Sequence, residues 1–69
     1  MMTQTAQKIY DECEEKVWQY ELMIENYMEY KRQNICKEEF CDKMINNYAK
    51  AIKETKQIMQ ALERGCQDE

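Results

Sequence analysis

Two stripes of apolar residues, each with alternating spacings of three and four, constrain this chain more than any other feature of its sequence. The first stripe consists of Ala6, Tyr10, Cys13, Val17, Tyr20, Ile24 and Tyr27. The second stripe consists of Cys41, Ile45, Tyr48, Ile52, Thr55, Met59, Leu62 and Cys66, with Thr55 as its only polar interruption. This spacing places the members of a stripe on one face of an α-helix, because the helix has about 3.6 residues per turn. The sequence therefore predicts two long amphipathic helices.

Each stripe is widened on the same side, by apolar residues that directly precede stripe positions. These flanking residues are Ile9, Met23 and Tyr30 in the first stripe, and Met44, Ala51 and Ile58 in the second. A stripe of this width exceeds the two-position seam of a simple coiled coil. It is typical of a helix that packs in a larger bundle.

The break between the stripes predicts a short turn. Asn34 tolerates the left-handed conformation that ends many helices, and Ile35 stands where an apolar contact usually accompanies such an end. A connection this short makes two helices antiparallel neighbours. We therefore expect an all-α protein with a single domain over residues 1–69. Its fold should be an antiparallel two-helix hairpin with helices at about 4–33 and 37–64.

The other helix ends also carry signals. Thr3 or Thr5 should cap the first helix, and Cys36 stands where serine or threonine would normally cap the second. Arg64 in the last turn and Gly65 directly after it predict the end of the second helix.

Opposite charges are consistent with this hairpin. With the turn near residue 35, residue i should lie opposite about residue 70 − i. Glu14 would then lie near Lys56, and Glu21 between Lys50 and Lys53. Exposed pairs of this kind are worth about 0–1 kcal/mol each. They bear on the orientation of the helices more than on stability.

The small size of the chain predicts self-association. Its 69 residues include no proline and one glycine, which argues against sandwiches and barrels because their turns need both residues. A single core of this size rarely supplies more than about 3–5 kcal/mol, and two helices bury only the seam between them. We therefore expect a homo-oligomer, with a dimer that forms a four-helix bundle favoured. A monomeric hairpin and a hairpin that needs a foreign partner are the alternatives.

Enzymatic activity and metal or cofactor binding are not expected. The chain has no histidine, which is the commonest general base and the commonest metal ligand. The four cysteines, Cys13, Cys36, Cys41 and Cys66, lie too far apart along a hairpin for a zinc site or a Cys13–Cys66 disulfide. No apolar run suits a membrane span or a signal peptide, so we expect a cytoplasmic protein with reduced thiols.

The distribution of charge points to a protein partner. Residues 1–30 carry two lysines and seven acidic residues, so we do not expect direct binding to nucleic acid. Trp18 and Leu22 lie four residues apart, off the apolar stripe and among carboxylates, and Trp is enriched at binding hot spots. The expected partner-binding residues are Trp18, Leu22, Glu14, Glu15, Glu21, Glu25 and Glu29.

From these features we expect a small adaptor or inhibitor that occupies a basic, partly apolar groove of a partner protein. A phage or mobile-element antagonist of a host nucleic-acid enzyme would fit this description, because aligned carboxylates imitate phosphates. One alternative is a purely structural homo-oligomer with Trp18 inside. Another is a binder of a small anionic ligand such as a nucleotide, held by Lys31, Arg32 and Lys37 near the turn.

Overall fold

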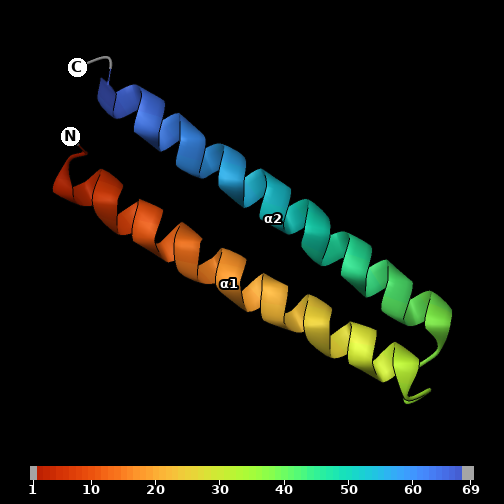
Figure 1. Ribbon diagram of the computed structural model, residues 1–69. Coiled ribbons are helices and arrows are strands. Elements are labelled where there is room, and N and C mark those ends of the chain that lie inside the picture. The colour runs from red at the N-terminus through yellow and green to blue at the C-terminus, as the bar shows by residue number, and fades with distance from the viewer. Residues whose placement is uncertain (1, 68–69) are drawn as a thin grey trace.

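The structure is a computed structural model that describes residues 2–67, with side chains described for residues 2–65. Within this part of the chain, helix α1 runs from Gln4 to Arg32 and helix α2 from Glu38 to Gln67. The two helices lie side by side and antiparallel, so the first turn of α1 and the last turn of α2 lie at the same end of the hairpin (Figure 1). The predicted all-α hairpin is confirmed.

Thr3 caps helix α1. Its backbone is extended, and its side-chain Oγ1 accepts a hydrogen bond of 3.1 Å from the amide of Ala6. Its carbonyl also accepts a bond from the amide of Gln7, at 2.8 Å. Of the two threonines predicted as caps, Thr3 is therefore the one that satisfies amides in the first turn of the helix.

A Schellman motif ends helix α1. Asn34 has a φ of 57°, in the left-handed region, and its amide donates to the carbonyl of Lys31 at 3.2 Å. The amide of Ile35 donates to the carbonyl of Tyr30 at 3.0 Å. These two bonds satisfy carbonyls that the end of the helix would otherwise leave unpaired. The prediction that Asn34 adopts this conformation is confirmed.

The predicted span of α2, about 37–64, lies close to the observed Glu38–Gln67, but two of the predicted end signals are wrong. The carbonyl of Lys37 accepts the first helical bond, from the amide of Cys41 at 3.0 Å, so Lys37 rather than Cys36 occupies the cap position. At the other end, α2 continues through Gly65, whose φ is not positive. A glycine inside a helix loses only about 1 kcal/mol relative to alanine, which a few further helical bonds can offset.

The two stripes form the seam between the helices. Cys13, Val17 and Cys41 are its buried residues. The ring of Tyr48 stacks on that of Tyr27, with centroids 6.1 Å apart, and lies tilted against that of Tyr20, at 5.8 Å. The residue numbers of the Tyr20–Tyr48 pair add to nearly 70, as the predicted pairing of the helices requires. The seam therefore sets both the register and the core.

The hairpin leaves much of its surface in water. Its extents are 51 × 15 × 12 Å, and its Cα radius of gyration is 15.6 Å. A compact domain of 69 residues would have a radius of gyration of about 11 Å.

Neither α1 nor α2, over the described residues, is long and apolar enough to cross a membrane.

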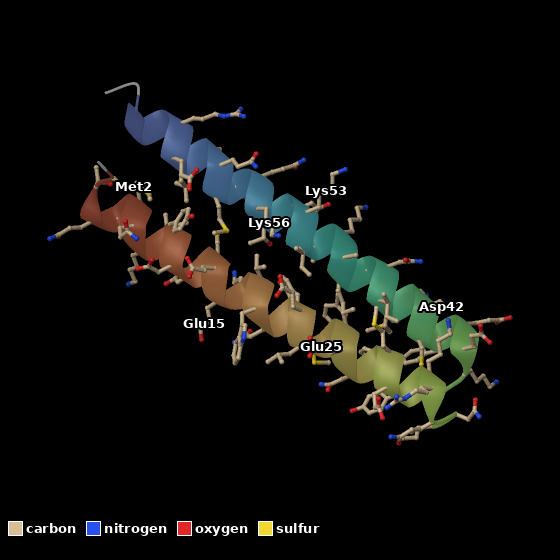
Figure 2. The ribbon with its side chains drawn as sticks, in the orientation of Figure 1. Met2, Glu15, Glu25, Asp42, Lys53 and Lys56 are labelled. Carbon is tan, nitrogen blue, oxygen red and sulfur yellow. The ribbon has the colours of Figure 1, made fainter. Side chains whose placement is uncertain are left out.

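The ion pairs that the sequence predicted between the helices do not form. Glu14 makes no salt bridge to Lys56, and Glu21 makes none to Lys50 or Lys53. Figure 2 shows Lys53 extending from α2 on the side away from α1. Long charged side chains remain in water because an exposed pair gains little against the loss of side-chain entropy.

Candidate protein-binding surface

The hairpin has two unlike sides. In an antiparallel pair of right-handed helices, residues that directly precede seam positions lie on one side of the pair, and residues that directly follow them lie on the other. The first side includes the apolar flanking residues of both stripes, and we call it the apolar face. Its apolar residues are Ile9, Met23, Tyr30, Phe40, Met44, Ala51, Ile58 and Ala61.

The α1 part of the other side is acidic. The residues that follow seam positions from Gln7 to Met28 include four acids and no base. Together with Trp18 and the neighbouring Glu15, they form what we call the acidic surface. It consists of Asp11, Glu14, Glu15, Trp18, Glu21 and Glu25.

Trp18 is the centre of the acidic surface. Its side chain is 61% exposed, and carboxylates border the shallow hollow beside it. The acidic residues that line this hollow are Asp11, Glu14, Glu15 and Glu21. Figure 2 shows Glu15 extending from α1 on the side away from α2, which leaves it free to meet another molecule. Glu25 follows Trp18 by seven residues, or about two turns, and so continues the same surface.

Leu22 belongs to a different hollow. It is 39% exposed and lines this hollow together with Tyr20, Met23 and Tyr48. Trp18 does not line it. The structure therefore separates the two residues that the sequence placed in one anchor pair, because Leu22 borders the apolar face and Trp18 borders the carboxylates.

Glu29 is already engaged within its own helix. Its carboxylate accepts hydrogen bonds from Arg32 and, at 2.6 Å, from the Gln33 side chain. The bond from Arg32 holds the pKa of Glu29 below its usual range. Of the predicted partner-binding carboxylates, Glu29 is thus the least available to another protein.

The predicted anion-binding residues do not form a free cationic cluster. Lys31 donates to Asp42 at 2.8 Å and lies 3.6 Å from the carboxylate of Glu38, and the bond to Asp42 raises the pKa of Lys31. Arg32 is paired with Glu29. Lys37 lines a hollow whose other residues, Glu38, Glu39 and Asp42, are acidic. These pairs weaken the case for a nucleotide site near the turn.

The sequence analysis missed a pair of thiols at the turn. Cys36 directly precedes the capping residue Lys37, and Cys41 stands four residues after it, which are the two positions of a hydrophobic staple. Burial raises the pKa of Cys41, and the adjacent Cys36 thiol adds to this effect. Cys13, Cys36 and Cys41 are unbridged, and the side chain of Cys66 lies outside the described residues.

Tyr10 lies near the open end of the hairpin, beside Glu63 of α2. Hydrogen bonding to that carboxylate, together with its negative charge, raises the pKa of Tyr10. Among the described residues, no three metal-binding side chains come together. In this part of the chain, the polar and charged side chains lie on the outside of the hairpin.

Comparisons with known proteins identified no relative of this chain. No protein-family model matches the chain, and searches of curated proteins and of solved structures found no match. The function must therefore be argued from the residues and their geometry.

Proposed function

We propose that this chain is a protein–protein interaction module, an adaptor or inhibitor that places Trp18 and the surrounding carboxylates in a basic, partly apolar groove of a partner protein. The observation that carries the proposal is the 61% exposure of Trp18 at the centre of the acidic surface. A large aromatic side chain surrounded by charge is a typical anchor, because it supplies much contact area with few rotatable bonds.

The position of Trp18 bears on the alternative, in which it packs inside a structural oligomer. That alternative requires Trp18 to share a side with the apolar flanking residues. Trp18 instead directly follows the seam residue Val17, whereas Ile9, Met23 and Ile58 directly precede seam positions. A bundle built on the apolar face would leave Trp18 exposed, which favours its use by another protein.

The charge of the surface indicates the chemistry of the partner. Four carboxylates line the hollow beside Trp18, and we expect them to meet lysines and arginines that steer association and fix its orientation. A groove that normally holds a nucleic-acid phosphate backbone has this character. The proposed mechanism is competition, in which the hairpin occupies the groove and excludes the nucleic acid.

Affinity purification with matched variants tests this proposal. The wild type should retain a partner that Trp18→Ala and the double variant Glu14→Lys, Glu21→Lys both lose. The control is the triple variant Glu39→Lys, Gln57→Lys, Gln60→Lys, which changes the net charge equally on exposed residues of α2 that lie off the apolar face. It should retain the partner.

The recovered partner is then tested directly. Its affinity for the hairpin should fall at least about tenfold between 50 and 300 mM salt, because surface charges are screened. The hairpin should also displace nucleic acid from it. Equal recovery by Trp18→Ala and the wild type would contradict the proposal.

A further inference from the structure

We infer that a second copy of this chain covers the apolar face, so that two hairpins form a two-fold symmetric four-helix bundle. This inference concerns a different surface from the acidic surface and does not depend on the proposed function. It rests on the exposure, the area and the charge of the apolar face.

The apolar face exposes large side chains from both helices. Ile9 is 40% exposed and Tyr30 36% on α1, while Phe40 is 47% and Ile58 51% exposed on α2. Tyr27 of α1 lies against Phe40 with ring centroids 6.0 Å apart, so the face is continuous across the seam. These side chains gather at the two ends of the face, with Ile9 and Ile58 near the open end and Tyr30 and Phe40 near the turn. Grouped exposed apolar side chains of this kind mark an interaction site on a soluble protein.

The exposed area matches the requirement of a dimer. The hairpin exposes 5652 Å². A compact monomer of 8.5 kDa would expose about 4,700 Å². The hairpin therefore exposes about 950 Å² more than a compact monomer, which is close to the roughly 800 Å² that each partner buries in a standard stable interface. Docking of one second hairpin would therefore bring the exposed surface per chain down to the usual value.

The charge of the apolar face selects a second copy as its occupant. Along both helices, the charged residues that directly precede seam positions between Ile9 and Ala61 are Glu12, Lys16 and Glu54. A nearly neutral face meets its own copy without repulsion. The acidic surface, in contrast, would repel itself. A two-fold interface uses the same patch on both subunits, so the face must be self-complementary.

A small side chain stands between two large ones on the α2 part of the face. Ala51 lies between Met44 and Ile58, each seven residues away and thus about two turns along the helix. The shallow hollow that Met23 and Tyr48 line can receive a protruding side chain of the partner copy. Interdigitation of this kind gives bundle cores their normal packing density.

Sedimentation equilibrium over a range of concentrations tests the inference. The wild type should behave as a dimer of the 8.5 kDa chain. Ile58→Lys should weaken dimerisation at least about tenfold, because it places a charge in an apolar interface. Trp18→Lys introduces the same side chain on the acidic surface and should leave the dimer intact.

A second variant separates dimerisation from folding. Asn47 is exposed and directly precedes the seam residue Tyr48, so Asn47→Lys disturbs nothing within one hairpin. It should nevertheless weaken the dimer, while circular dichroism at high concentration shows unchanged helicity. A wild type that remains monomeric at 100 µM would overturn the inference, and so would a dimer that Trp18→Lys dissociates and Asn47→Lys does not.

Discussion

The apolar face and the acidic surface lie on opposite sides of the same hairpin, and their difference follows from a shift of two positions along the helix, from the residue before a seam position to the residue after it. Large apolar side chains such as Met23 and Ile58 directly precede seam positions. A residue that directly follows one on α1 tends to be acidic, as at Glu14 and Glu21. The comparison teaches that a chain too small to build a full core can still carry two distinct surfaces, one suited to self-association and one to a foreign partner.

The largest expected effect contrasts two adjacent residues of α1. Val17 is 8% exposed in the seam, whereas Trp18 is 61% exposed. Val17→Asp should abolish folding at 25 °C, because burial of an unpaired carboxylate outweighs the few kcal/mol that stabilise so small a protein. Trp18→Asp should change the free energy of unfolding by less than about 1 kcal/mol. Urea unfolding followed by circular dichroism measures both, and equal losses would contradict this division of the helix.

The thiols at the turn should differ strongly in reactivity. Cys41 is fully buried and its pKa is raised, whereas Cys36 is partly exposed. Only the thiolate reacts, so iodoacetamide at pH 8 should modify Cys36 at least about tenfold faster than Cys41. Mass spectrometry of peptides gives the two rates, with Cys36→Ser as the control that assigns the fast site. Similar rates would mean that the seam opens at this end.

Alkaline pH should lower the free energy of unfolding of the hairpin. The responsible groups, Tyr27 and Cys41, lie in the seam and not on the acidic surface. Burial raises the pKa of Tyr27 above 10.0 and that of Cys41 above 9.0, so the unfolded chain loses these protons first. Between the ordinary and the raised pKa the native state binds more protons, and stability therefore falls as pH rises. The urea midpoint should be lower at pH 10.5 than at pH 8, and Tyr27→Phe should reduce this difference. A midpoint that rises with pH would contradict the burial of these groups.

The smallest expected effect concerns the turn between the two helices. Asn34 holds a left-handed φ of 57°. Asn34→Ala should destabilise the hairpin by about 1 kcal/mol, whereas Asn34→Gly should be neutral or slightly stabilising, since glycine adopts this conformation without strain. Thermal unfolding at one fixed concentration compares the two. A larger loss for glycine would indicate that the Asn34 side chain itself is required.

Much of the fold could be predicted from the sequence because local and long-range signals agree. The stripe through Val17, the stripe through Tyr48 and the helix end at Asn34 each point to the same hairpin. The predictions that failed depended on weak interactions. Gly65 does not end α2, and Glu14 does not pair with Lys56, because a fraction of a kcal/mol decides each case.

The candidate surface could be predicted only in part. The sequence indicated Trp18 among carboxylates, and the structure places Glu14, Glu15 and Glu21 around it. The separation of Leu22 from Trp18 could be seen only in the structure. Residues four apart on a helix are offset by about 40° around its axis, and this offset lets each side chain border a different hollow.

The exposure of Trp18 has a practical consequence. It is the single tryptophan of the chain, so the intrinsic fluorescence of the protein reports on one point of its surface. Assembly through the apolar face would leave that emission nearly unchanged, whereas contact with a partner at the acidic surface would move the indole out of water and shift the emission to shorter wavelength. The emission of Trp18 can therefore distinguish the inferred self-association from the proposed binding to a partner without any added dye.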